Sequence, residues 1–318
     1  MFQFIYWLKA LAVILITNSH YADIWPVSAM AAGGHWGNCL FFLVSGFCLC
    51  HMKDSFPKWY TKRIVRIYPV LWIAVIINLL VGFFSIRSVS VFIQCFLYPT
   101  SYHFIASIML LYILFYLVRK IQGRTGLKTK SVLLITIAVF AIVYLFWFDK
   151  SYYHIDRVEE NWVRFQFWFS MMLGVWLRER YDAIEPQIPS AEWIVFGVLF
   201  VGYFAGKVLV SRYQSLSMVQ FLSPALLVML VYHTALIFIK LEKRGVFAST
   251  PKANQIAQFL ASITLEVYLV QNVIVQRLSY LVFPLNLMVV TVLIVVHAWV
   301  VHLCAVWLQK RLGKLLKI

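Results

Sequence analysis

The stretch LNLMVVTVLIVVHAWVVHLCAVWL, residues 285–308, decides the fold class of this protein. It contains no Asp, Glu, Lys or Arg. A helix needs roughly 20 mostly apolar residues to cross the hydrocarbon core of a bilayer. We therefore predict that residues 285–308 form a transmembrane helix.

Stretches of the same kind recur along the whole chain. The predicted transmembrane helices are residues 3–20, 36–52, 64–84, 102–118, 131–148, 162–177, 191–210, 218–239, 256–278 and 285–308. Residues 89–98 are apolar but too short to span a membrane. The expected fold class is all-α: a polytopic membrane bundle of about ten transmembrane helices, forming one domain over residues 1–318 with no separate soluble domain.

The composition agrees with a lipid environment. Of the 318 residues, 63% are hydrophobic and 13% are charged, whereas soluble domains are roughly 45–50% apolar and about 25% charged. The net charge of +16 does not indicate nucleic acid, because the basic residues cluster between apolar stretches. The five cysteines lie in apolar stretches without metal-ligand spacing, so we expect no metal.

The basic residues also predict an orientation. Twenty of the 28 Lys and Arg residues lie in loops on one side of the predicted topology, and seven lie in loops on the other side. Cytoplasmic loops carry the excess of basic residues. Both termini are therefore predicted to be cytoplasmic, which agrees with an even number of helices.

Lys9 and His20 bracket the first predicted helix. Eleven residues turn an α-helix to within about 20° of three full turns, so the two side chains share one face, roughly 16 Å apart along the axis. Ionisable groups inside a membrane usually face a cavity or a partner, so the pair can line one path. The alternative is that Lys9 snorkels to the inner surface and His20 sits in interfacial water.

Glu266 is the only carboxylate that we place deep within a predicted helix. It needs a cation or hydrogen-bond donors, and Lys9 is the candidate partner. His103 and Arg164 begin predicted helices on the same outer side as His20, where each can contact a substrate or be an ordinary interfacial residue. Three further histidines are expected to serve in packing: His233, His297 and His302.

The segment KRIVRIYP, residues 62–69, opens the third predicted helix. Arg63 and Arg66 are three residues apart and share one helix face. Paired guanidinium groups suit phosphate recognition, although a plain cluster of inner-loop charge gives the same pattern. In the second helix, Ser45 and Gly46 permit close helix packing, and no base is apparent beside Ser45 to make it a nucleophile.

Together these motifs resemble the acyltransferase-3 family of bacterial membrane acyltransferases. The family's first helix carries a basic residue, ten residues and a histidine, matched by Lys9 and His20. Its FFxxSGF element is matched by FFLVSGF at 41–47, and its KRxxRxxP-like element at 62–69. Residues 262–271 are similar to its SxxxYLxH element. The chain departs from the family at Lys9, where Arg is usual, and at Gln271, where His is usual.

The resemblance implies transfer of an acyl group, most often acetyl, from cytoplasmic acyl-CoA to a hydroxyl of a surface polysaccharide or its precursor across the bacterial inner membrane. His20 would be the general base, which suits an imidazole with its unperturbed pKa of about 6.5. The implied site residues fall into three groups: His20, Lys9 and Glu266 for catalysis; Arg63, Arg66, Lys62 and Ser45 for acetyl-CoA; and His103, Arg164 and Gln271 for the substrate.

An exporter of a polysaccharide or its precursor is the alternative function. A bundle interior that holds Lys, His and Glu also suits a relay. The paired arginines favour the enzyme, because a pure exporter needs no phosphate clamp on its inner face. The acceptor sugar, the length of the acyl group and the oligomeric state stay open at this point, as does the choice between direct transfer and transfer through an acyl-histidine.

Overall fold

A computed structural model of the chain describes residues 2–83, 85–158, 160–278 and 280–316. The regular elements in these ranges are all helical, and the ranges contain no strand. The all-α prediction is therefore confirmed. Its physical basis is that a backbone segment crossing lipid satisfies its own polar groups when it is helical.

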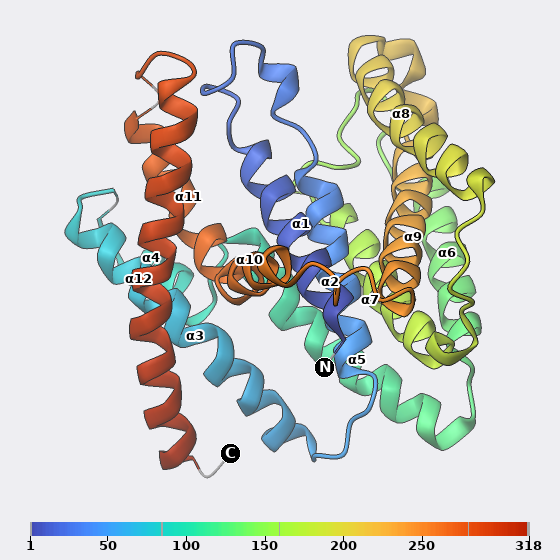
Figure 1. Ribbon diagram of the computed structural model, residues 1–318, viewed down its shortest axis with the longest axis horizontal. Helices are drawn as coiled ribbons and strands as arrows, with labels where there is room; N and C mark the ends of the chain where they lie inside the picture. The colour runs from blue at the N-terminus through green and yellow to red at the C-terminus, as the bar shows by residue number, and fades with distance from the viewer. Residues whose placement is uncertain (1, 84, 159, 279, 317–318) are drawn as a thin grey trace. The chain divides into compact units, whose positions relative to one another are not determined.

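Figure 1 shows the order of the elements along the chain. In chain order the α-helices of the described residues are α1 (Gln3–Ser19), α2 (Gly34–Leu49), α3 (Phe56–Leu80), α4 (Val89–Phe92), α5 (His103–Thr125), α6 (Thr129–Phe146), α7 (Trp162–Glu179), α8 (Ser190–Arg212), α9 (Leu222–Lys243), α10 (Pro251–Ser262), α11 (Thr264–Leu278) and α12 (Leu285–Leu315). Short segments of other helical types lie at Ser28–Met30, Ile93–Leu97, Tyr181–Ala183 and Gln214–Val219.

Six helices of the described residues are long and apolar enough to cross a membrane alone, namely α3, α5, α6, α8, α9 and α12. The bent pair α10 and α11 adds a seventh span if the two helices are counted as one. Helix α1 is also apolar but has only 17 residues. The chain is thus a multi-pass helical membrane protein, while the count of ten spans and the cytoplasmic termini stay predictions.

Helix α3 begins at Phe56, eight residues before the start predicted at position 64. Ser55 has the extended backbone of an N-cap, and Pro57 occupies the first turn, where a missing amide proton costs no helical hydrogen bond. The KRIVRIYP segment therefore lies inside α3. The predicted end of this helix at Phe84 lies outside the described residues.

The prediction of one continuous helix over residues 256–278 is wrong. The structure divides it into α10 and α11, whose axes differ by 70°. At the break, Ser262 Oγ donates to the Phe259 carbonyl at 2.7 Å, and Thr264 Oγ1 donates to the Leu260 carbonyl at 3.0 Å. Side chains that bond back to helical carbonyls compete with the backbone ladder and favour bends.

Contacts within the chain divide it into two compact units. Unit 1 consists of Met1–Lys9, Asn38–His51 and Leu117–Ile256, and it contains α6 to α9. Unit 2 consists of Ala10–Gly37, Met52–Tyr116 and Ala257–Ile318, and it contains α3, α4, α11 and α12. Four of the five boundaries fall inside helices, namely α1, α2, α5 and α10, and the fifth lies between α2 and α3. The single domain over residues 1–318 stays a prediction.

In unit 1, helices α2 and α7 cross with their backbones in contact. A Cβ atom at Gly46 would lie 1.8 Å from the Met171 carbonyl oxygen, and one at Gly174 would lie 1.9 Å from the Leu43 carbonyl oxygen. Any side chain at either position would therefore force the helices apart. The close approach predicted at Gly46 is confirmed.

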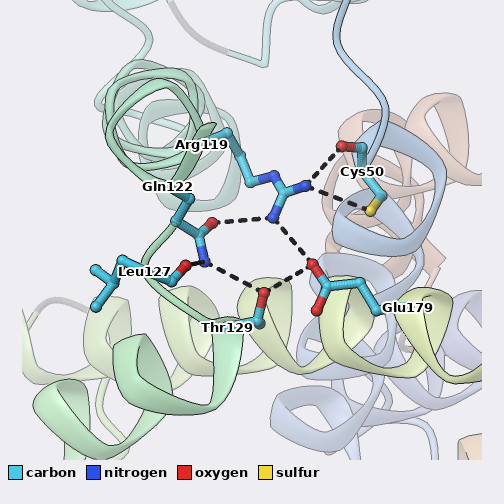
Figure 2. Close-up of polar contacts among 6 residues, drawn as sticks. All are labelled: Cys50, Arg119, Gln122, Leu127, Thr129 and Glu179. Atoms are coloured by element: carbon cyan, nitrogen blue, oxygen red, sulfur yellow. Dashed lines mark hydrogen bonds and ion pairs between the residues drawn. The ribbon is translucent and has the colours of Figure 1, made fainter. Parts of the chain in front are cut away.

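A polar network closes the connection between α5 and α6 in unit 1 (Figure 2). Arg119 donates to Gln122 Oε1 at 2.9 Å, to Glu179 Oε1 at 3.2 Å and to the Cys50 carbonyl at 3.1 Å. Thr129 Oγ1 donates to the same Glu179 oxygen at 2.8 Å. Because every member bonds at least one other, the network fixes the ends of α5, α6 and α7.

Candidate functional site

His20 lies in a turn directly after α1. Its amide donates to the Thr17 carbonyl at 3.0 Å, which continues the helix by one tighter turn. Asn18 then fixes the chain that follows, since its Nδ2 donates to the Met30 and Ala32 carbonyls at 2.8 and 3.0 Å. The backbone that carries the imidazole is therefore held on both sides.

The residues after His20 attach this turn to α12 within unit 2. The hydroxyls of Tyr21 and Thr291 lie 2.9 Å apart, and Asn286 Nδ2 donates to the Ile24 carbonyl at 2.9 Å. Burial lowers the pKa of His20 from its usual 6.5, because the charged imidazolium loses hydration. Near neutral pH the imidazole is therefore uncharged and able to accept a proton.

Glu266 is 3% exposed, and its Oε1 lies 2.7 Å from Nδ1 of His302 on α12. The expectation that His302 serves only in packing is therefore wrong. The expected partner, Lys9, belongs to unit 1. Thirty-six residues separate Glu266 from His302, so local sequence reasoning missed the pair. Residue chemistry could have indicated the contact, because a buried carboxylate needs a hydrogen-bond donor and the histidines of α12 can supply one.

The spacing along α12 sets the depth of these groups relative to each other. Thr291, which contacts Tyr21, and His302, which contacts Glu266, are eleven residues apart. That separation corresponds to roughly 16 Å along the helix axis. The carboxylate–histidine pair thus lies well away from the turn that carries His20.

Gln271 and His103, both predicted to bind substrate, are brought to one neighbourhood of unit 2. Tyr268 is three residues before Gln271 and shares its face of α11. Its hydroxyl accepts a hydrogen bond from the Phe104 amide, next to His103, at 3.2 Å. On the other side of His103, the Tyr102 hydroxyl accepts from Asn78 Nδ2 at 3.1 Å. Tyr268 belongs to the element matched at residues 262–271, whereas sequence reasoning did not identify the other supporting residues.

The basic segment of α3 has three different local environments. Lys62 Nζ lies 2.7 Å from Asp54 Oδ2, so its charge is partly neutralised. The Arg63 guanidinium lies over the Trp59 ring, 4.8 Å from its centroid. Arg66 is exposed, which leaves it accessible to a phosphate from outside the bundle.

The C-terminal end of α12 contacts this basic segment. Gln309 Nε2 donates to the Arg66 carbonyl at 2.9 Å. The contact brings the charge at the end of α12, Lys310, Arg311 and Lys314, to the same region of unit 2. The sequence predictions used these three residues only for topology. Together with Lys62, Arg63 and Arg66 they make up the basic residues of this region, which we call the cationic patch.

Three predicted site residues belong to unit 1. The Lys9 ammonium lies 6.0 Å from the centroid of the Phe41 ring, at the edge of the range for a cation–π contact. Ser45 lies on α2, next to the close crossing at Gly46. Arg164 donates to Asn161 Oδ1 at 2.7 Å at the start of α7. Their roles in a site stay predictions.

Unit 1 also holds a cavity of about 510 Å³ between α6, α7 and α9. Its lining is almost entirely apolar, and the hydroxyls of Thr136 and Tyr144 in its wall donate to the carbonyls of Val132 and Met218. None of the predicted site residues lines it. We therefore do not assign the chemistry of the protein to this cavity.

The chain is thus a multi-pass helical membrane protein in which α12 contacts both the turn of His20 and the basic segment of α3. The imidazole of His20 is uncharged near neutral pH. A family model described as an acyltransferase domain, that of the acyltransferase-3 family, matches residues 2–307. The chain therefore belongs to this family, and its class of activity is acyl transfer from a donor to an acceptor. No curated protein and no solved structure matches the chain significantly.

Proposed function

We propose that this protein is an O-acyltransferase of the bacterial inner membrane. In this proposal it moves an acyl group, acetyl in the first instance, from cytoplasmic acetyl-CoA to a hydroxyl of a surface polysaccharide or its precursor. The acceptor binds on the extracytoplasmic side. Family membership supports acyl transfer in general. The identity of the donor, the identity of the acceptor and their binding on opposite sides of the membrane are our proposal.

One observation carries the proposal. Helix α12 contacts the turn of His20 through Thr291 and the arginine segment through Gln309. These two positions are 18 residues apart, which corresponds to roughly 27 Å along a helix. The hydrocarbon core of a bilayer is about 30 Å thick. A donor-binding patch and a base at opposite ends of such a helix suit a reaction that crosses the membrane.

The donor would bind at the inner end. Arg63 and Arg66 can hold the CoA phosphates by charge-assisted, bidentate hydrogen bonds. Lys62 adds less, because Asp54 already engages its ammonium group. Ser45 would border the donor path, and Lys9, on the helix that leads to His20, would contact the pantetheine arm.

The chemistry would take place at His20. Its neutral imidazole removes the proton from the acceptor hydroxyl while the oxygen attacks the thioester carbonyl carbon. The C–O bond forms, the tetrahedral intermediate collapses, and the C–S bond breaks. The imidazolium then returns its proton to the CoA thiolate, so the protein ends in its starting state.

The remaining site residues would act around this step. His103 and Arg164 would bind the acceptor. Glu266 with His302 lies roughly 16 Å along α12 from the contact beside His20, so we assign this pair to holding α11 against α12 in the catalytic arrangement. Breaking this hydrogen bond would leave a buried polar group of Glu266 unpaired, which costs more than losing a surface contact does.

The first test is donor binding to the detergent-purified protein by calorimetry. Saturable acetyl-CoA binding is expected, and Arg63→Ala with Arg66→Ala should weaken it by about a hundredfold, because two charge-assisted contacts are lost. Arg124→Ala with Lys130→Ala is the matched control, since both residues are basic, exposed and distant from α3 in the chain. The control should bind like the wild type.

The second test is transfer itself. His20→Ala should abolish acyl transfer and leave the acetyl-CoA affinity within about twofold. Full activity in His20→Ala would contradict the general-base role. Movement of the glycan across the membrane without donor binding would instead identify an exporter.

A further inference from the structure

Gln271 on α11 is completely buried, yet neither Oε1 nor Nε2 of its carboxamide has a hydrogen-bond partner among the described residues. Buried polar groups are nearly always hydrogen-bonded, because an unpaired group keeps the full cost of leaving water. The Gln271 carboxamide is buried with both polar atoms unpaired within the described part of the chain. This arrangement therefore points to a ligand that hydrogen-bonds the carboxamide when it is bound.

Gln122, also buried, shows how this chain treats a structural glutamine (Figure 2). Its Oε1 accepts from Arg119 at 2.9 Å, and its Nε2 donates to the Leu127 carbonyl and to Thr129 Oγ1, each at 3.2 Å. Every polar atom of that side chain has a partner. The difference between the two glutamines is therefore not explained by burial.

The position of Gln271 lies between the two contacts that define the site in unit 2. It follows Glu266 by five residues, roughly 7.5 Å along α11. Helices α11 and α12 run in opposite directions (Figure 1), and Glu266 contacts His302. Residues nearer the C-terminal end of α11 therefore lie closer, along the helix axis, to Thr291 of α12. Thr291 contacts Tyr21, the neighbour of His20.

We propose that the Gln271 carboxamide hydrogen-bonds the pantetheine arm of the acyl donor, at the amide that lies two methylene groups from the thioester sulfur. The proposal rests on the proposed function, which brings this arm from the arginine pair into the bundle. An anchor at this amide would hold the thioester carbonyl near the level of His20.

The chemistry of the unused atoms selects this kind of ligand. A secondary amide offers an N–H for Oε1 and a carbonyl for Nε2, and it is neutral, so it can enter an apolar interior without the cost of a charge. The CoA phosphates are charged and would lose hydration in this interior, so we expect them to stay bound at Arg63 and Arg66. A glycan hydroxyl pair has a similar hydrogen-bonding capacity, and the experiment separates it from the arm.

The experiment compares two ligands on the purified, unliganded protein and its Gln271→Met variant, which removes the carboxamide at similar length. CoA carries the arm, and adenosine 3′,5′-bisphosphate carries the phosphates without it. We expect the Kd for CoA to rise about tenfold, the size of a lost hydrogen-bonding group. The Kd for the bisphosphate should not change. The melting temperature of the unliganded variant should equal or exceed that of the wild type, because an unpaired polar group is gone.

Gln122→Met is the matched control, and it should lower the melting temperature while leaving the CoA affinity unchanged. A similar loss of stability in Gln271→Met, or failure to fold in both Gln271→Met and Gln271→Leu, would make the carboxamide structural and overturn the proposal. So would unchanged CoA affinity, including the case in which only the acceptor KM rises. Absence of CoA binding to the wild type would instead overturn the proposed function, and this inference with it.

Discussion

At the scale of single residues, burial acts differently on His20 and Glu266. Desolvation of His20 favours its neutral form, which is the form that accepts a proton. Glu266 is more deeply buried and is matched with a histidine nitrogen at 2.7 Å. The first arrangement leaves the imidazole of His20 uncharged, whereas the second gives one oxygen of the buried Glu266 carboxylate a hydrogen-bond partner.

The pKa of His20 predicts the pH dependence of acyl transfer. Because only the neutral imidazole is a base, kcat/KM for the acceptor should rise with pH and reach a plateau, with a midpoint below 6.5. Activity is thus lost as pH falls through the lowered pKa. The same shift disfavours folding at low pH, because the unfolded chain binds this proton more tightly. A pH series from 5 to 8 measures the profile, and a midpoint above 6.5 would contradict it.

At the scale of elements, the crossing of α2 and α7 depends on two glycines. Membrane helices associate through close packing rather than through exclusion of water, so small residues at a crossing carry much of the contact. The carbonyls of Met171 and Leu43 occupy the space where side chains at Gly46 and Gly174 would stand. The SGF portion of the second-helix motif is therefore structural at its glycine.

Gly46→Ala should destabilise the protein by about 2–3 kcal/mol, because overpacking against a backbone atom moves a whole helix. The measurement is the thermal unfolding midpoint in detergent. Gly202→Ala on α8 is the control, since a Cβ there would meet only Leu226 Cδ1 at 4.0 Å. The control should be neutral or slightly stabilising. Equal stability of the two variants would disprove a tight crossing at Gly46.

At the scale of the whole molecule, the proposed reaction has a direction across the membrane. Within unit 2, α12 joins the turn of His20 at one end to the arginine segment at the other. Its length suits the thickness of a bilayer. In the proposed reaction, a helix of this length would keep the donor and the acceptor in separate compartments and would connect their two binding sites.

Reconstitution into vesicles tests this directionality. With the protein oriented so that a tag on the C-terminus faces outward, acetyl-CoA added outside should acylate a glycan acceptor enclosed in the lumen. Acetyl-CoA enclosed with the acceptor should give at least tenfold less product, because the arginine patch then faces the other compartment. Equal product from both arrangements would argue against transfer across the membrane. Arg63→Ala with Arg66→Ala should reduce product in the first arrangement.

The long apolar stretches, such as residues 285–308, determined the helical membrane class from sequence alone, since burying their surface in lipid overrides every local alternative. The motif residues Lys9 and His20, and likewise Arg63 and Arg66, were also visible, because the two members of each pair lie within one motif of the sequence. Tertiary structure decided the bend between α10 and α11, the pairing of Glu266 with His302 and the unpaired state of Gln271. Each of these depends on which distant side chain reaches a buried polar group, and sequence spacing carries no information about that.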